Sequence, residues 1–166
     1  MRERERIDVG WREWLALPEI GLPAIKAKID TGARTSALHA WKIEPFREGG
    51  APWLRFHLHP LQRDTALSVA CLAPVHDRRM VSDSGGHRER RYVIETPVQM
   101  GTYSWRIELT LTDRDTMLFR MLLGRRAMRG FRVLPDASFL TAPSLSAEQA
   151  AAHYSEPDRL RETTRR

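Results

Sequence analysis

The sequence has 166 residues, enough for one domain with a substantial buried core, and its 42% hydrophobic and 29% charged residues exclude a fibrous or wholly disordered chain. The formal net charge of +6 favours a negatively charged partner. No apolar run approaches the ~20 residues of a membrane span, residues 1–6 lack the apolar core of a secretory signal, and one cysteine cannot form an internal disulfide. We therefore expect a cytoplasmic protein that makes no membrane contact, with Cys71 in its core.

The predicted elements are mainly short strands separated by turns. Alternating or continuous apolar runs predict strands at residues 10–17, 24–30, 53–59, 66–73, 92–98, 103–112, 119–124 and 131–134. Two further features are a loop at residues 33–41 that returns as a short strand and a second loop at residues 47–52. A short helix is expected after residue 125. Many short strands with turns between them indicate an all-β barrel.

The barrel is expected to form one domain over residues 14–140. Residues 2–6 alternate arginine and glutamate, and residues 1–13 are expected to form a charged N-terminal arm. Beyond residue 141 the composition turns to Ala, Glu, Ser and Arg, which predicts a loosely attached helix or disorder over residues 141–166.

One stretch of the chain combines a strand pattern with a carboxylate. Apolar and charged residues alternate through residues 24–29, and the pattern then breaks into Asp30, Thr31, Gly32 and Ala33. Gly32 permits a turn that a residue with a Cβ atom resists. The pattern predicts a carboxylate at the end of a rigid strand with small polar neighbours, as general acid/base chemistry requires. An ordinary strand-to-turn aspartate is the alternative interpretation.

A second stretch, residues 119–125, is an apolar strand that ends in Gly124 and Arg125. An early Asp-Thr-Gly-Ala together with a late apolar-apolar-Gly-Arg is the pair of marks carried by retropepsin-like aspartic proteases. Residues 28–40 and 119–125 resemble more specifically a bacterial family whose members accompany the glutamate ligase RimK and were formerly called ATP-dependent zinc proteases. The resemblance covers roughly residues 14–140.

The resemblance implies an all-β, retropepsin-like closed barrel with one short helix after the Leu-Leu-Gly strand. It implies an aspartic-type peptidase in which Asp30, Thr31 and Gly32 form the catalytic element. It also implies a functional link to RimK, which adds glutamates to the C-terminus of a small-subunit ribosomal protein, so that a polyglutamate-tailed protein or another acidic peptide is the expected substrate.

Aspartic proteases use two carboxylates that share one proton. The chain holds one Asp-Thr-Gly and is too short for two lobes, so a homodimer that brings two copies of Asp30 together is expected. One residue departs from the family pattern, because retropepsins commonly carry an acid where Arg34 stands, and that acid pairs with the arginine equivalent to Arg125. Either the dimer contact is rebuilt or Arg34 holds an acidic substrate, and in the second case Asp83 or Asp113 is a candidate partner within one chain.

Residues 76–91 form a polar stretch that is either disordered or a functional hairpin. Retropepsins place at this point the flap that closes over the substrate. The residues expected to contact substrate, from the flap and from the two motifs, are Ala33, Arg34, Ser84, Gly85, Gly86, Arg88 and Arg125. Arg90 and Arg91 are expected to face the same cleft.

The positive charge is concentrated in the folded middle of the chain. Residues 114–132 contain six arginines against one acid, Asp115. Arginine binds carboxylate and phosphate through a planar fork. The expected partner is therefore an acidic peptide or a nucleic acid, and a non-enzymatic arginine-rich binding module for either is the second hypothesis.

A zinc-dependent hydrolase is the third hypothesis. His57 and His59 lie two residues apart on a predicted strand and share a face, but the sequence contains no His-Glu-x-x-His. Two histidines on a solvent-exposed strand face are more often hydrated than bound to a metal ion. No metal ligand and no cofactor are therefore assigned.

Overall fold

The computed structural model describes residues 6–82, 85–114 and 117–155. Its elements, in chain order, are β1 (Ile7–Val9), β2 (Arg12–Leu17), the 3-10 helix η1 (Pro18–Ile20), β3 (Leu22–Ile29), β4 (Ser36–His39), β5 (Trp41–Glu48), β6 (Ala51–Leu58), β7 (Val69–Pro74), β8 (Asp77–Ser82), β9 (Arg88–Met100), β10 (Tyr103–Thr112), β11 (Met121–Leu123), the 3-10 helix η2 (Arg125–Ala127), β12 (Phe131–Val133) and α1 (Ala147–Tyr154).

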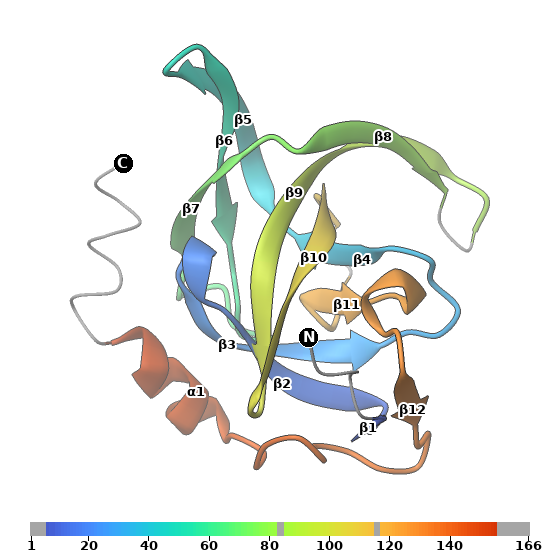
Figure 1. The fold of residues 1–166 in the computed structure, drawn as a ribbon. Coiled ribbons are helices and arrows are strands. Elements are labelled where there is room, and N and C mark those ends of the chain that lie inside the picture. Colours follow the sequence, from blue (N-terminus) through green and yellow to red (C-terminus); the bar gives the residue numbers. More distant parts are fainter. Residues whose placement is uncertain (1–5, 83–84, 115–116, 156–166) are drawn as a thin grey trace.

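Six strands form a closed barrel. Their order is β10, β4, β11, β3, β2 and β9, and pairing between β9 and β10 closes the ring. Strand β11 lies between β3, to which it is parallel, and β4, to which it is antiparallel. The all-β closed barrel and the short helix after the Leu-Leu-Gly strand are thereby confirmed (Figure 1).

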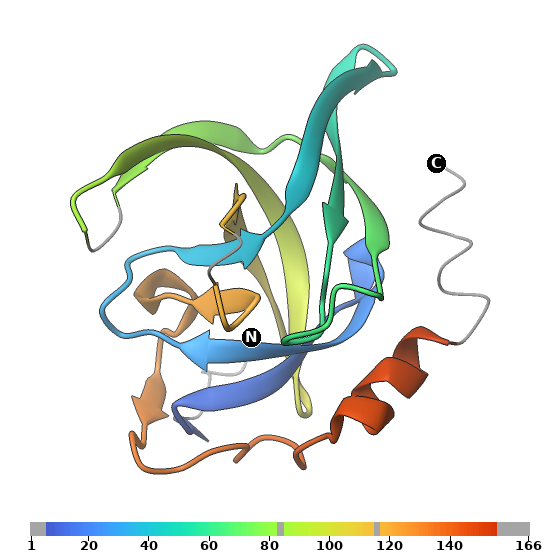
Figure 2. The same cartoon turned by 180° about the vertical axis from the view of Figure 1, so that it is seen from behind.

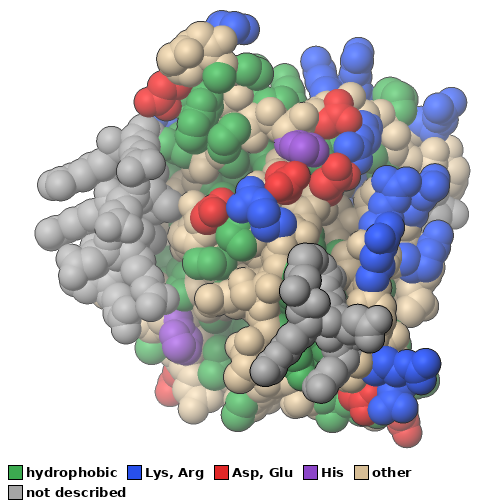
Figure 3. Space-filling model, in the orientation of Figure 1, with side chains coloured by type: hydrophobic (Ala, Val, Ile, Leu, Met, Phe, Trp, Pro, Cys, Tyr) green, Lys and Arg blue, Asp and Glu red, His purple; other side chains and the backbone are tan. Residues whose placement is uncertain are grey.

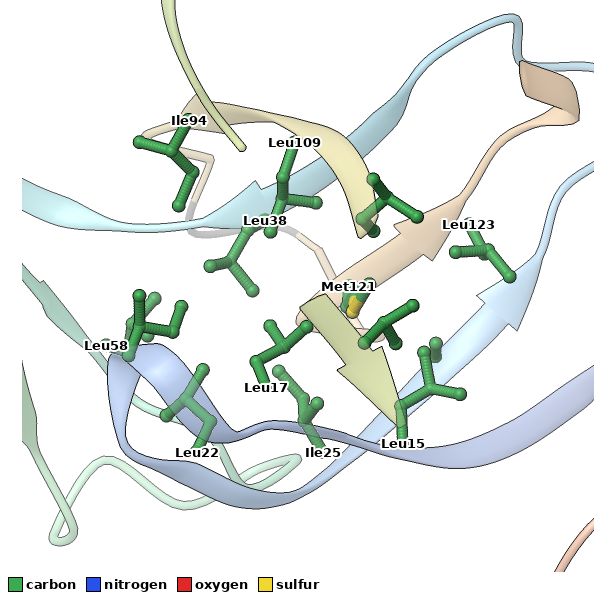
Figure 4. Close-up of a cluster of buried hydrophobic side chains, with 14 of the residues drawn as sticks. Leu15, Leu17, Leu22, Ile25, Leu38, Leu58, Ile94, Leu109, Met121 and Leu123 are labelled. Atoms are coloured by element: carbon green, nitrogen blue, oxygen red, sulfur yellow. The ribbon is translucent and has the colours of Figure 1, made fainter. Parts of the chain in front are cut away.

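The barrel interior holds the hydrophobic core. Fully buried side chains from many strands converge there, and Figure 4 shows Leu17, Ile25, Leu38, Leu109 and Met121 among them. Strand β2 shows how a barrel strand contributes to this core. Its residues alternate between buried and half-buried positions, because successive side chains of a strand point to opposite faces of the barrel wall. Cys71 is also fully buried, as predicted, and burial raises the pKa of its thiol.

Strands β5, β6 and β7 form a separate antiparallel sheet whose β5–β6 hairpin projects from the barrel (Figures 1 and 2). Strand β6 buries Leu54, Phe56 and Leu58, in agreement with the predicted alternation. The loop predicted at residues 47–52 is wrong, because both strands continue and only Gly49 and Gly50 form the turn, with φ values of 58° and 78°. Strand β5 was missed because none of its residues is buried, so it carries no apolar period.

The polar stretch at residues 76–91 is a hairpin rather than a disordered segment. Strand β8 pairs with β9 from Asp77 opposite Val93 to Ser82 opposite Arg88. Strand β9 therefore starts earlier than the sequence indicates and is 13 residues long. Its N-terminal part reaches beyond the barrel wall together with β8 (Figures 1 and 2).

Both chain ends are more closely attached than expected. Strand β1 pairs with β12, and Glu13 is fully buried, so residues 7–13 belong to the fold rather than to a free arm. Helix α1 starts with a capping box between Ser146 and Gln149 and buries Ala150 and Tyr154, whose hydroxyl donates to the carbonyl oxygen of Ala24. This packing differs from the loose attachment expected for residues 141–166, of which 156–166 lie outside the described residues, as do residues 1–5. No helix in the described ranges is both long and apolar enough to cross a membrane.

Candidate active site

The Asp-Thr-Gly element follows directly on the end of β3. Because β11 runs parallel to β3 with Leu123 opposite Ile29, the backbone N–H of Asp30 donates to the carbonyl oxygen of Leu123 at 2.9 Å. The N–H of Gly32 donates to the Asp30 Oδ1 atom at 3.0 Å, and the N–H of Ala33 donates to the Asp30 carbonyl at 3.2 Å. The carboxylate is thus anchored at one oxygen on a rigid strand end, and its other oxygen accepts no hydrogen bond from the described residues.

The second motif is bonded to the same loop by its backbone. The N–H of Arg125 donates to the carbonyl oxygen of Ala33 at 2.8 Å, and the N–H of Arg126 donates to that of Arg34 at 3.1 Å. The Arg125 Nη1 atom donates to the carbonyl oxygen of Thr31 at 2.9 Å. The two motifs that lie about ninety positions apart in the sequence therefore form one rigid unit.

Gly124 is required by this close approach. A Cβ atom at this position would lie 2.5 Å from the carbonyl carbon and oxygen of Thr35, which is closer than real Cβ contacts. Its N–H donates to the Ser36 Oγ atom at 3.0 Å. Because its φ is −92°, the need for glycine comes from space and not from a left-handed backbone.

Among the described residues, Asp30 is the one carboxylate at this site, whereas aspartic proteases use two. None of the other carboxylates in the described part of the chain is hydrogen bonded to Asp30. Asp113 follows β10 at Thr112, which pairs with His39, whereas the Asp30 loop enters β4 at Ser36, so Asp113 lies toward the opposite end of β4. Asp83 lies outside the described residues.

The residues expected to contact substrate are distributed over the loop, η2 and the hairpin. Arg34 and Gly32 are exposed on the loop, Ala33 is half-buried, and Gly85, Gly86 and Arg88 are exposed at the hairpin end. Ser84 lies outside the described residues. The hairpin end and the loop over residues 30–35 lie on the same side of the barrel in both ribbon views (Figures 1 and 2). Arg125 is exposed, but it also holds the Thr31 carbonyl in place.

A buried arginine links the hairpin to the motif region. The Arg91 side chain is only 7% exposed. Its Nε atom donates to Glu89 at 3.1 Å and its Nη1 atom lies 3.5 Å from the Thr110 hydroxyl oxygen, which in turn donates to the Ser36 carbonyl at 3.0 Å. Arg91 thus faces inward, as expected, but it is engaged within the fold. Thr110 carried no sequence signal, because its role depends on the parallel register of β4 and β10.

Many arginines near the motifs have no acid to pair with. Arg79 and Arg106 on the outer face of β8–β10 pair with carboxylates at 2.5–2.8 Å. By contrast, the following arginines pair with no carboxylate of the described residues: Arg34, Arg88, Arg90, Arg125, Arg126 and Arg129. Figure 3 shows Lys and Arg side chains gathered on the side of the molecule where the hairpin and the loop lie. This side is suited to a negatively charged ligand.

His57 and His59 both lie against the ring of Trp41, with centroid separations of 5.1 and 5.2 Å. Partial burial, followed by Lys42, lowers the pKa of His57. Within the described residues no three His, Cys, Asp or Glu side chains are close enough together to hold a metal ion.

The closed barrel and the joined Asp-Thr-Gly and Gly-Arg motifs define a retropepsin-like protein. The chain belongs to the RimB-like family, because residues 8–140 match the family described as "Retropepsin-like aspartic endopeptidase RimB". This membership confirms the resemblance that the two motifs carried.

Curated relatives place the same domain inside longer proteins. The chain is 48% identical over 132 residues to a "Probable alpha-L-glutamate ligase" from Shewanella halifaxensis, and 52% identical over 131 residues to one from Parasynechococcus marenigrum. These matches cover 79% of this chain but only 29% and 28% of the relatives, so the chain spans less than a third of their length. A crystal structure of a protein of unknown function from Legionella pneumophila has the same fold, with a TM-score of 0.68 and 26% identity over 81% of this chain and 98% of that one.

Proposed function

We propose that this protein is an aspartic-type peptidase that hydrolyses peptide bonds in acidic, glutamate-rich tails. The observation that carries the proposal is the Asp30 carboxylate, which is fixed at one oxygen and leaves the other without a protein partner in the described chain, at the end of a strand in a retropepsin-like barrel. A carboxylate held in this way can accept a proton from a water molecule without reorganisation of the site.

The reaction needs a second carboxyl group, and a second copy of the chain supplies it as its own Asp30. The ionised Asp30 takes a proton from water, the resulting hydroxide attacks the peptide carbonyl carbon, and the protonated Asp30 of the other copy donates to the carbonyl oxygen. The first Asp30 then gives its proton to the amide nitrogen. As the C–N bond breaks, one hydroxyl of the gem-diol intermediate returns its proton to the other Asp30, so the dyad again holds one proton. The functional form is accordingly a homodimer in the cytoplasm.

The charge of the site supports an acidic substrate. Arg34 is exposed four residues after Asp30. Arg125 and Arg126 of η2 and Arg88 and Arg90 of the hairpin have no carboxylate partner in the described chain. Charge-assisted bonds to substrate carboxylates contribute roughly 1.5–3 kcal/mol each when they are partly desolvated. The curated relatives carry the name of a ligase that acts on glutamate. We infer that the chain removes or trims glutamate chains made by such a ligase, including those on a ribosomal protein.

Mass spectrometry of oligoglutamate peptides incubated with the protein tests this proposal. Asp30→Asn keeps the shape of the side chain and removes the base, so cleavage is expected to fall by at least about a thousandfold while the fold survives. Asp64→Asn is the matched control, because Asp64 Oδ1 accepts the N–H of Ala66 at 2.8 Å in the same way that Asp30 accepts that of Gly32. This control should cleave at the wild-type rate.

Two outcomes would replace the proposal. Full activity of Asp30→Asn together with loss of activity in a chelator would favour the zinc hydrolase. Binding of acidic peptide by the wild-type dimer without any cleavage would favour the arginine-rich binding module, and tighter binding of single-stranded RNA would identify RNA as its ligand.

A further inference from the structure

Three cations lie together on the outer face of β2 and β3, along the strand that leads into the Asp30 loop. Arg12 stands opposite Lys28, and Trp14 stands opposite Lys26, in the antiparallel register of the two strands. Opposed residues of an antiparallel pair share a face, and so do residues two apart on one strand. Arg12, Lys26 and Lys28 therefore form a cation row on one face.

The cation row lacks carboxylates. None of its three side chains pairs with an acid of the described residues. The Arg12 Nε atom donates to the Ser138 hydroxyl at 3.2 Å, and the Lys26 Nζ atom donates to the Gln62 side-chain oxygen at 3.0 Å. Both partners are neutral. Like charges directly opposite each other destabilise a strand pair, so the row carries a repulsion that a bound anion would relieve.

Burial increases the repulsion. Lys26 and Arg12 are only partly exposed, and burial followed by the neighbouring Arg12 lowers the pKa of Lys26. The indole Nε1 of Trp14, whose ring centroid lies 5.4 Å from the Lys26 Nζ atom, is buried and has no hydrogen-bond acceptor.

We propose that the cation row is a second binding site, which holds carboxylates of an acidic peptide at a distance from the catalytic residue. This inference rests on the proposed function and names the part of the protein that distinguishes long acidic tails from short ones. Lys28 lies on β3 two residues before Asp30, which follows the strand, and Lys26 lies two residues further away. The row thus leads from the proposed catalytic carboxylate along β3.

The spacing fits an extended peptide. Alternate residues of a strand are about 6.6–6.8 Å apart, and alternate glutamates of an extended chain have the same separation. Lys26 and Lys28 can therefore contact alternate glutamates of one tail. A nucleic acid fits this face less well, because proteins that bind single strands stack the bases on free aromatic rings. Here the rings of Trp11 and Trp14 already contact cations of the protein: Arg12 lies 4.7 Å from the ring centroid of Trp11, and Lys26 lies beside Trp14.

Binding of oligoglutamates to the full-length Asp30→Asn protein tests the site without cleavage. Peptides of about four and about twelve glutamates are titrated by calorimetry and by tryptophan fluorescence. They extend over about 13 and about 40 Å, so only the longer one reaches beyond Lys26 when it is centred on Asp30. Lys26→Gln with Lys28→Gln is expected to weaken binding of the long peptide about tenfold, because two partly screened ion pairs are lost, and to reduce the preference for the long peptide over the short one.

Lys42→Gln is the matched control, because Lys42 lies 5.2 Å from the ring of Trp41 in the other sheet and makes the same kind of contact as Lys26. It should leave both affinities unchanged. Wild-type affinity of the double variant for the long peptide, with circular dichroism confirming its fold, overturns the inference. So does a double variant that loses affinity only for a single-stranded oligonucleotide. Failure of the wild type to cleave any peptide would reject the proposed peptidase activity. It would not affect the test of the cation row, because that test measures binding and not cleavage.

Discussion

Glu13 is fully buried, and its carboxylate accepts four hydrogen bonds. The Oε2 atom accepts the N–H groups of Gly10 and Leu140 at 2.8 and 3.0 Å, and the Oε1 atom accepts the N–H and hydroxyl of Thr141 at 3.0 and 2.7 Å. One residue therefore fastens the segment before α1 to the start of β2. Asp30 shows the opposite arrangement, with a single hydrogen bond to its carboxylate. A carboxylate such as that of Glu13, with both oxygens hydrogen bonded, fits a structural role. A carboxylate such as that of Asp30, with one oxygen that accepts no hydrogen bond from the described residues, fits a base.

Glu13→Gln is expected to lower the free energy of unfolding by about 3 kcal/mol. The amide nitrogen of glutamine replaces one acceptor oxygen. At the Oε1 position it can donate to the Thr141 hydroxyl but faces the Thr141 N–H, so at least one buried N–H loses its acceptor and the remaining donors lose a charged acceptor. Urea denaturation gives the difference. Glu44→Gln on the exposed face of β5 is the control and should change stability by less than about 0.5 kcal/mol. Equal stability of the two variants would contradict the structural role of Glu13.

At the scale of elements, two glycines allow close backbone contacts. Gly124 allows the end of β11 to pack against the Asp30 loop, and Gly10 allows the chain between β1 and β2 to pack against the C-terminal segment. A Cβ atom at Gly10 would lie 2.3 Å from the Ala137 carbonyl oxygen, much as one at Gly124 would meet Thr35. Gly10→Ala and Gly124→Ala should therefore both destabilise the protein, by roughly 1–3 kcal/mol. Only Gly124→Ala displaces the Asp30 loop, so at a temperature where both variants are folded it alone should lower kcat. Equal kcat in the two variants would show that the loop tolerates the displacement.

The hairpin has an electrostatic attachment to the barrel. The Arg79 side chain on β8 donates to both oxygens of Glu108 on β10, and its hydrogen bonds hold the pKa of Glu108 below its ordinary value, with a smaller contribution from His76. A lowered carboxyl pKa adds stability at neutral pH, and this stability is lost as the pH falls from about 4.3 through the folded-state pKa.

Glu108→Gln is therefore expected to be less stable than the wild type at neutral pH, by less than about 1 kcal/mol because more than a third of the side chain is exposed. The difference should shrink as the pH is lowered from 7 to 3, because the stability from the lowered pKa of Glu108 is lost as the pH falls through its folded-state pKa. Thermal unfolding at the two pH values measures it, with Glu48→Gln at the exposed β5–β6 turn as the control. A difference that stays constant with pH would assign the loss to packing.

Sequence patterns predicted the strands whose side chains alternate between buried and exposed positions. They missed the strand segments that are held only by backbone hydrogen bonds to a neighbouring strand. The barrel strands, the core position of Cys71 and the meeting of the two motifs follow from apolar period and from the family resemblance. Strand β5 and the first residues of β9 carry no buried side chains that would produce a period, so only the hydrogen-bonded ladder reveals them. Glu13 looked like one charge among many in an N-terminal arm, because the four donors that surround it come from residues far along the chain as well as nearby.

At the scale of the whole molecule, the incomplete site is the main reason to expect a dimer. The described chain presents one candidate catalytic carboxylate, that of Asp30. Arg125 bonds to Thr31 of its own chain, and Arg34 stands where retropepsins commonly carry an acid. The contact of the proposed dimer is therefore expected to differ from the arginine–acid bridge of other retropepsins. Sedimentation at increasing protein concentration should show a monomer that converts to a dimer, and a monomer at all concentrations that still cleaves peptide would exclude a site shared by two copies.

Mixing wild-type protein with Asp30→Asn tests whether the two carboxylates come from different copies. If the site is shared across a two-fold axis, a mixed dimer has one carboxylate and is inactive, so activity falls as the square of the wild-type fraction. An equal mixture that has exchanged subunits should retain about one quarter of the activity, whereas two independent sites retain about one half. The same mixture made with Asp64→Asn should lose nothing. A linear dependence on the wild-type fraction would place both catalytic groups within one chain and would make Asp83, a second acid that the sequence proposes, the next residue to substitute.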